Sequence, residues 1–262
     1  MSIVSTDGQN RGDHALLEVV VQHPRDVPGA DEGGADRLFV VGDVEAGGLS
    51  PEPATVSAVC KETEVPVRVM LRLNDGLSTT GGELSRLVGL GEDYLAVGAE
   101  GVSFGFLTAD LEVDVEVCSY LADRLPQVPW TFHRAVDSAL STDRAWRQMG
   151  GLPGLDAVLS AGSVRGLEAG CDELVERAGA DPQVARLVIA GGGLRGEHVP
   201  WLARAGVRRF HVGSTVRPGG SWTKAYVDAA HVRSWRMLVA DAVGRADAAR
   251  DAGRDAVGGS EA

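Results

Sequence analysis

One phrase recurs along the chain: a short β-branched run, often preceded by Pro or a charged residue, ends in a small or polar residue and leads into a helical stretch. The copies read ALLEVVV, DRLFVVG, PVRVMLR, GVSFGFL, PWTFHRA, DAVLSAG, RLVIAGG and RRFHVGS. They predict strands near residues 15–21, 36–42, 66–72, 101–107, 128–134, 156–162, 186–192 and 208–214. Strands that alternate with helices form parallel βαβ units, and eight such units close a barrel. We therefore predict an α/β protein with the (β/α)8 TIM barrel fold.

The segments between the strands carry helix signals. Residues 53–64 begin at a Pro-rich stretch, residues 110–125 begin at Asp110, a good N-cap, and residues 197–206 end in Gly206, a typical C-cap. The length of 262 residues fits one (β/α)8 domain, which needs about 250 residues. We place this domain at residues 14–246. Residues 1–13 and 247–262 are polar or rich in Ala and Gly, which predicts disordered tails.

Polar residues inside the strands point to a site. Strands of a closed parallel barrel are covered on both faces, so a polar residue within one needs a reason. Alternation places one set of side chains on the face toward the barrel interior: Glu18, Arg37, Arg72, Ser103, Thr131, His133, Ser160 and His211. The other face then holds Leu17, Leu38, Leu71, Phe104, Phe132, Leu159 and Val212. This pattern predicts a polar mouth surrounded by an apolar layer.

Two interpretations of the interior charges remain open. Glu18, Arg37 and Arg72 could form an ion-pair network that only fills the barrel. Paired charges in an interior of low dielectric constant rarely stabilise more than apolar packing, which favours a functional role.

Two glycine-rich segments follow the seventh and eighth predicted strands. They are IAGGGL, with Gly192 and Gly193, and HVGST, with Gly213 and Ser214. In (β/α)8 enzymes these two loops often present backbone N–H groups to a phosphate. The alternative is that the glycines only allow tight turns. As substrate-binding candidates we take Ser103, Thr131, Ser160, Gly192, Gly193, His211, Gly213 and Ser214.

The fifth copy, FHRAVD, places His133, Arg134 and Asp137 at one strand end. Histidine suits proton transfer near neutral pH, and a neighbouring arginine can hold an anionic oxygen. The base would be Glu18 or His133. Our catalytic candidates are Glu18, Arg37, Arg72, His133, Arg134 and Asp137.

Composition excludes several classes. A net charge of -12 argues against nucleic acid and anionic membranes as partners. Three cysteines without CxxC spacing indicate neither a disulfide framework nor a metal site. Neither Lys61 nor Lys224 lies on a predicted strand, which disfavours a Schiff-base aldolase. The first residues lack an apolar signal region and no run of about 18 apolar residues occurs, so we expect a cytoplasmic protein.

Six segments resemble, in order, those of the CutC copper homeostasis family: LLEV, GGADRL, GGLSP, TFHRAVD, VLSAG and AGGGLR. The resemblance covers residues 15–240. It implies a cytoplasmic TIM barrel that forms a homo-oligomer, a dimer or tetramer, and is linked to copper handling. The chain departs from the family at Val41, where members often have Cys, and at Phe39, which replaces an acidic residue. A motif similar to IRPR is reduced to LRLN, which keeps Arg72.

Two hypotheses follow. The first is an enzyme of the isomerase or lyase type, without a cofactor, that transfers a proton next to a carbonyl of a small anionic, phosphate- or carboxylate-bearing metabolite. The alternative is a copper-binding protein without catalytic activity, with His133, His211 or a cysteine as ligands. Copper(I) prefers Cys and Met, so the missing thiol favours the first hypothesis.

Overall fold

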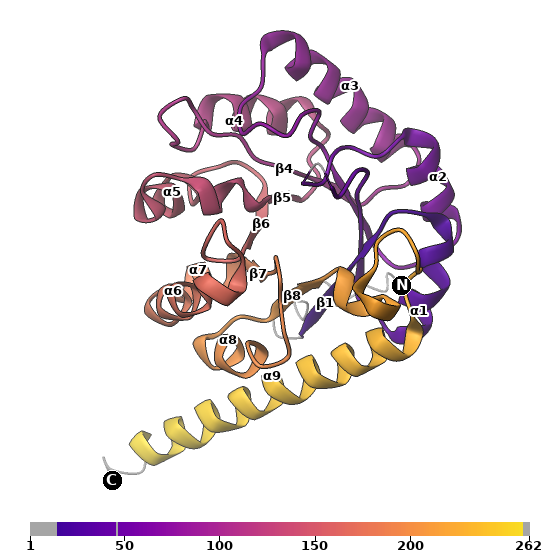
Figure 1. Cartoon of the computed structure of the whole chain (residues 1–262). Helices are drawn as coiled ribbons and strands as arrows, with labels where there is room; N and C mark the ends of the chain where they lie inside the picture. The colour runs from indigo at the N-terminus through magenta and orange to yellow at the C-terminus, as the bar shows by residue number, and fades with distance from the viewer. Residues whose placement is uncertain (1–14, 46, 259–262) are drawn as a thin grey trace, which may run out of the picture.

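Eight parallel strands close a barrel in chain order, and β8 pairs with β1 (Figure 1). The computed structural model describes residues 15–45 and 47–258, and the predicted tail 1–13 lies outside them. The strands are β1 Leu16–Val21, β2 Arg37–Val40, β3 Val67–Met70, β4 Gly101–Phe104, β5 Trp130–Phe132, β6 Leu155–Ser160, β7 Val188–Ala190 and β8 Arg209–Val212. Each overlaps the segment predicted for it, and the (β/α)8 prediction is confirmed.

Helices surround the barrel (Figure 1). They are α1 Val27–Gly33, α2 Pro53–Lys61, α3 Gly81–Ala96, α4 Val115–Arg124, α5 Thr142–Met149, α6 Leu167–Ala180, α7 Pro182–Leu187, α8 Val199–Ala205 and α9 Ala229–Gly258. Short 3₁₀ turns occupy Pro24–Asp26, Arg134–Ser138, Ser214–Val216 and Pro218–Gly220. No helix within the described ranges has the length and apolar character needed to cross a membrane.

Two predicted boundaries are wrong. Helix α4 begins at Val115 and is capped by Asp114, whose side chain accepts the Val117 N–H at 3.0 Å, instead of beginning at Asp110. Residues 108–113 form a turn closed by an antiparallel bridge between Leu107 and Val113.

The predicted disorder from residue 247 is also wrong for the part that the structure describes, because α9 continues to Gly258. The Ala-rich composition that suggested disorder also favours a helix, since Ala is the strongest helix former. Helix α9 packs along α1 and α8 (Figure 1). Beyond residue 247 it keeps a contact with the barrel, because Arg250 Nη2 donates to the Arg204 carbonyl at 2.9 Å.

The main core lies between the strands and the helices. It contains Leu17, Leu38, Leu71, Phe104, Phe132 and Val212, as alternation predicts. A second apolar layer lies inside the barrel. It consists of Val20, Phe39 and Met70 from the first three strands, Val41 directly after β2, and Ala157, Leu159 and Ile189 from β6 and β7.

The predicted alternation fails on β6. The pairing between β5 and β6 shifts register between Trp130 and Thr131, so that Thr131 lies beside Ala157. Because side chains alternate along a strand, Ala157 and Leu159 face the interior and Ser160 shares the face of Val158. The predicted positions of Leu159 and Ser160 are therefore exchanged.

Candidate functional site

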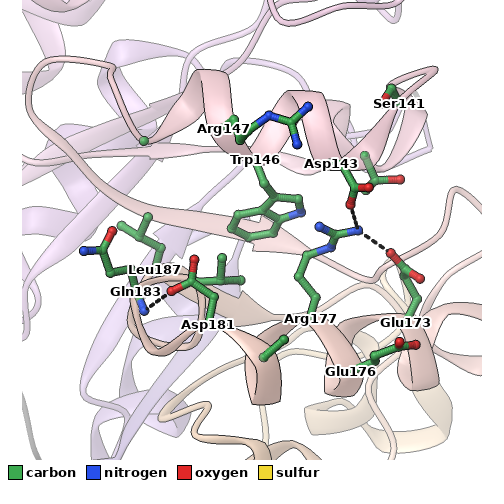
Figure 2. Close-up of a pocket in the computed structure, with 14 residues that line it drawn as sticks. Ser141, Asp143, Trp146, Arg147, Glu173, Glu176, Arg177, Asp181, Gln183 and Leu187 are labelled. Atoms are coloured by element: carbon green, nitrogen blue, oxygen red, sulfur yellow. Dashed lines mark hydrogen bonds and ion pairs between the residues drawn. The ribbon is translucent and has the colours of Figure 1, made fainter.

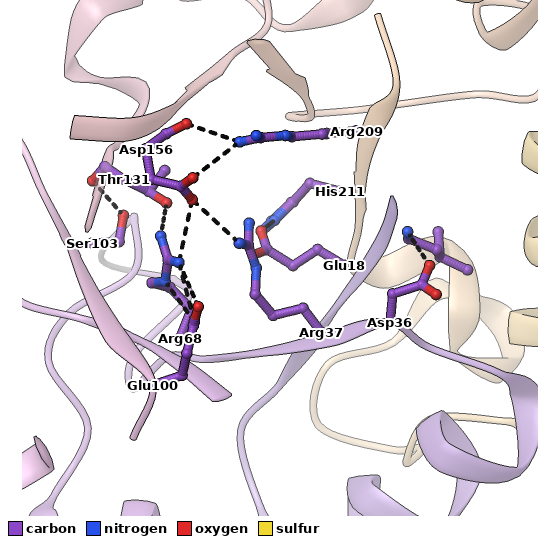
Figure 3. A network of polar contacts seen from close by, with 11 residues as sticks. Glu18, Asp36, Arg37, Arg68, Glu100, Ser103, Thr131, Asp156, Arg209 and His211 are labelled. Carbon is purple, nitrogen blue, oxygen red and sulfur yellow. Dashed lines mark hydrogen bonds and ion pairs between the residues drawn. The ribbon is translucent and has the colours of Figure 1, made fainter. Parts of the chain in front are cut away.

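A network of paired charges fills the lower part of the barrel interior (Figure 3). It contains three arginines and three carboxylates: Arg37, Arg68, Arg209, Glu18, Glu100 and Asp156. Asp156 lies at its centre, with its carboxylate oxygens 3.4 to 3.7 Å from nitrogens of all three arginines. Opposite charges are thus balanced, which is how an interior of low dielectric constant tolerates them. Glu18 and Arg37 therefore belong to an ion-pair network, as the first of the two interpretations of the interior charges predicts.

Glu18 connects this network to His211 (Figure 3). Its Oε2 accepts from Arg37 Nε at 2.6 Å, and its Oε1 lies 2.7 Å from His211 Nδ1. Burial alone would raise the pKa of Glu18, but the charge of Arg37 and the His211 hydrogen bond outweigh burial and lower this pKa to about 2. A carboxylate only accepts hydrogen bonds, so His211 carries a proton on Nδ1. The Nε2 atom of neutral His211 is therefore an acceptor.

Above the inner apolar layer, at the carboxyl ends of the strands, lies a cavity of about 430 Å³. We call it the mouth cavity. Its floor is apolar, with Val20, Phe39, Met70 and Leu159. Its polar lining includes Arg72, His133, Arg134, Ser138 and His211. The carboxyl ends of the strands are where (β/α)8 enzymes carry their active sites.

His133 has one defined tautomer. Its Nδ1 accepts the Ala135 N–H at 3.1 Å, so the proton of the neutral ring lies on Nε2. The residue is 4% exposed, and Nε2 has no hydrogen-bond partner among the described residues. Burial, together with the charge of Arg72, lowers the pKa of His133 to about 3. At physiological pH His133 is thus a neutral N–H donor.

Arg72 supplies a second donor of this kind. It lies two residues beyond the end of β3, where Nη1 donates to the Gly47 carbonyl at 3.0 Å and Nη2 to the Asp75 carbonyl at 2.6 Å. Its buried Nε has no partner in the part of the chain that the structure describes. Burial lowers the pKa of Arg72, yet a guanidinium stays charged in proteins. Arg72 therefore combines a positive charge with a donor that has no partner.

A smaller cavity of about 140 Å³ adjoins the mouth cavity. We call it the glycine cavity, because Gly192, Gly193 and Gly213 line it together with Ser214 and Thr215. Gly193 has a φ of +83°, and a Cβ there would meet no atom of the described residues within 4 Å. Backbone groups are therefore open to a ligand on this side. Among the residues that the structure describes, three line both cavities, namely Val20, His211 and Trp222.

Arg134 is held in place by Asp137. The carboxylate of Asp137 accepts from Arg134 Nε at 2.8 Å, from Ser160 Oγ at 2.6 Å and from the Ala161 N–H at 3.1 Å. Asp137 and Ser160 thus fasten the end of β6 to the turn that carries Arg134, and neither lines the two cavities.

The predicted site residues fall into two groups, one that lines the two cavities and one that lies deeper in the barrel. The cavities bring together Arg72, His133, Arg134, His211, Gly192, Gly193, Gly213 and Ser214. Glu18, Arg37, Ser103 and Thr131 lie below, where Thr131 Oγ1 accepts from Arg68 Nη1 at 2.7 Å and Ser103 Oγ donates to the Thr131 carbonyl at 3.2 Å. The prediction missed Arg68, although it shares the strand face of Arg72. It also missed Trp222, which lies in a loop without periodicity.

A larger groove of about 850 Å³ lies outside the barrel, between α5, α6 and α7 (Figure 2). Its central Arg177 is already paired, with Asp143 Oδ1 at 2.9 Å and Glu173 Oε1 at 2.6 Å. None of the predicted site residues lines this groove. We therefore place the candidate site at the barrel mouth.

Fold and site together define a (β/α)8 barrel with a cavity at the carboxyl ends of its strands. The model of the CutC family matches residues 15–216, and the chain belongs to the CutC family. The copper homeostasis protein cutC homolog of Homo sapiens is 29% identical over 208 residues, which cover 75% of this chain and 72% of that protein. A CutC family protein of Vibrio vulnificus (strain YJ016) is 31% identical over 210 residues, covering 77% and 82%.

Among solved structures, the CutC protein from Streptococcus agalactiae superposes with a TM-score of 0.67 at 21% identity, covering 76% of this chain and 98% of that chain. The family resemblance seen in the motifs is confirmed.

The three cysteines are not placed to bind one copper ion together. Copper(I) prefers thiolate and thioether ligands, but Cys60, Cys118 and Cys171 lie on three different outer helices. Burial raises the pKa of Cys118 to about 12, which disfavours its thiolate. Within residues 15–45 and 47–258, no three His, Cys, Asp or Glu side chains form a group that could hold a metal ion. Phe39 and Val41 line the mouth cavity at the two positions where the family resemblance leads one to expect an acid and a thiol.

Proposed function

We propose that this protein is an enzyme that binds a small anionic carbonyl compound at the barrel mouth and moves a proton at the carbon next to the carbonyl. The observation that carries the proposal is the pair of buried donors, Arg72 Nε and His133 Nε2, which have no partner among the described residues. A buried donor without a partner costs about 1–3 kcal/mol. Both residues line the mouth cavity, and a ligand oxygen that comes within hydrogen-bond distance of these nitrogens would satisfy them.

His211 is the base that the contacts favour, in place of Glu18 or His133. Glu18 lies below the cavity with both oxygens occupied, and the Nδ1 of His133 is occupied by a backbone N–H. The Nε2 of His211 is the acceptor, and Glu18 fixes its tautomer, as a buried carboxylate does for the histidine of a catalytic triad.

The step balances without a cofactor. His211 Nε2 takes the proton from the carbon next to the carbonyl, and the electron pair of that C–H bond forms a C=C bond. The carbonyl π pair moves to oxygen, which becomes an enolate. His133 Nε2–H and the Arg72 guanidinium stabilise this negative charge. When the carbon that loses the proton carries a hydroxyl group, return of the proton to the former carbonyl carbon, with movement of the hydroxyl proton to the enolate oxygen, gives an isomerase. Departure of a leaving group from the carbon next to the enolate C=C bond, as the C=O bond forms again, gives a lyase.

Exchange of substrate protons in D2O tests this step without knowledge of the final product. We expect the wild-type protein to replace carbon-bound protons next to the carbonyl of dihydroxyacetone phosphate or pyruvate with deuterium, as followed by ¹H NMR. His211→Gln removes the base and should lower the rate by about 10²–10⁴-fold. The control is His231→Gln, because His231 lies on the exposed face of α9. Exchange that is equally fast in His211→Gln would overturn the assignment.

Metal analysis addresses the copper alternative that the relatives' names suggest. The proposal expects purified protein to lose added Cu(I) on gel filtration. Stoichiometric Cu(I) that remains bound would overturn it in favour of a copper-binding role.

A further inference from the structure

The segment 218–226, which we call the strap, leaves the barrel after β8 and returns to it before α9. Both of its ends are held by one carboxylate. Arg217 donates from Nη1 and Nη2 to Asp26 at 2.9 and 2.8 Å, and the Val227 N–H donates to Asp26 Oδ1 at 3.0 Å. Asp26 is fully buried and also accepts the Gln22 N–H at 2.9 Å. The strap is therefore a closed loop with a rigid base.

The strap carries one large side chain toward the site, that of Trp222. The Arg217 guanidinium lies 4.8 Å from the centroid of the indole ring. A Cβ on Gly213 would come within 2.6 Å of this ring, so the indole lies directly against the Gly213 backbone. Trp222 also packs on the cluster of Val20, Phe39, Val41 and Met70. These contacts define the position of a ring that helix and strand periodicity do not predict.

Trp222 stands where the two cavities meet. Within the part of the chain that the structure describes, Val20 and His211 are the only other residues that line both cavities. A molecule that fills both cavities must therefore run past His211, with the indole against its middle. Its two ends would face different chemistry: Arg72 and His133 in the mouth cavity, and glycine backbone with Ser214 in the glycine cavity.

We propose that Trp222 determines substrate specificity, selecting a phosphorylated carbonyl compound whose phosphate occupies the glycine cavity and whose carbonyl oxygen lies between Arg72 and His133. This inference rests on the proposed function and adds the substrate class. The carbon that joins the two ends lies beside His211, which is where the proton transfer needs it. A free phosphate or an unphosphorylated ketone occupies one cavity only and has less contact with the indole.

Binding measurements on Trp222→Ala test the inference, with dihydroxyacetone phosphate, inorganic phosphate and dihydroxyacetone as probes in calorimetry. We expect wild type to bind dihydroxyacetone phosphate more tightly than either of the other probes. In Trp222→Ala this preference over phosphate should fall about tenfold, a loss of 1.4 kcal/mol. Trp222→Phe keeps a ring and should retain most of the preference.

The matched control is Trp201→Ala, because Trp201 also lies beside an arginine, Arg204, but is 59% exposed on α8. Its melting temperature and its preference among probes should equal those of wild type. An unchanged preference in Trp222→Ala, with phosphate-ester binding intact, would overturn the role of Trp222 and leave the proposed function standing. A wild-type protein that binds none of the three probes would overturn the phosphorylated substrate class, and proton exchange on pyruvate would then decide the proposed function separately.

Discussion

The Oε1 atom of Glu18 lies 2.7 Å from Nδ1 of His211, and this contact joins the charge network of the barrel interior to the cavity at the mouth. Glu18 is 1% exposed, whereas His211 lines both cavities. The buried carboxylate thus controls the tautomer of a side chain that a ligand can reach. The two interpretations of the interior charges, a network that fills the barrel and a role in the site, are therefore compatible.

Replacing Glu18 by Gln should destabilise the protein in a pH-dependent way. The change leaves Arg37 buried beside a neutral amide, which costs about 3–5 kcal/mol of unfolding free energy at pH 7. The pKa of Glu18 is lowered from 4.5 to about 2, so its contribution is complete above pH 4.5 and is lost as the pH falls toward 2. Urea unfolding at pH 7, 5.5, 4 and 3 should show the difference between wild type and E18Q shrinking only below pH 4.5. A difference that is constant down to pH 3 would contradict the assigned ion pair.

His133 should keep its proton on Nε2 throughout the physiological range. Burial, together with Arg72, lowers its pKa to about 3, so the folded ring stays neutral between pH 5 and 8. In ¹⁵N-histidine spectra, the signals lost in His133→Gln should show the Nε2–H tautomer and no titration in this range. For function, Gln keeps an N–H donor on its side chain, and Phe has none. Binding of dihydroxyacetone phosphate should therefore weaken much more in His133→Phe than in His133→Gln, and equal losses would argue against a donor role.

Two neighbouring glycines give a matched pair of substitutions. Gly192 and Gly193 have φ values of +85° and +83°, so Ala at either position costs roughly 1–2 kcal/mol of backbone strain. A Cβ on Gly192 would also lie 2.7 Å from the Arg134 guanidinium, whereas one on Gly193 meets no atom within 4 Å in the described part of the chain. Thermal unfolding should thus show a larger loss for Gly192→Ala than for Gly193→Ala. Equal losses would mean that Arg134 moves aside without cost.

The sequence predicts which face of a strand each candidate side chain occupies better than it predicts the height of that side chain along the barrel axis. Buried parallel strands are apolar runs, so all eight could be found, and residues at their ends, such as His133 and Arg72, could be assigned to the mouth. Alternation cannot show that Glu18 and Thr131 lie a layer below, because the relative height of strands depends on the stagger of the closed barrel. The register shift between β5 and β6 has a similar effect. It exchanges the strand faces expected for Leu159 and Ser160, and alternation alone does not reveal it. Trp222 lies in a loop, where packing rather than periodicity sets its position.

Asp26 should hold the strap closed, and proteolysis can show this in the folded protein. Asp26→Asn removes the buried negative charge that Arg217 contacts, which costs about 3–5 kcal/mol and should loosen both ends of the strap. The chain has two lysines, Lys61 at the end of α2 and Lys224 in the strap, so a lysine-specific protease reports on each separately. Cleavage at Lys224 should accelerate in D26N more than cleavage at Lys61, which serves as the measure of global unfolding. Asp31→Asn, which removes a charge outside the barrel but keeps an oxygen that accepts from the Thr63 hydroxyl, is the control and should leave both rates near wild type. Parallel acceleration at both lysines in D26N would mean that Asp26 stabilises the whole barrel and that the strap has no separate mobility.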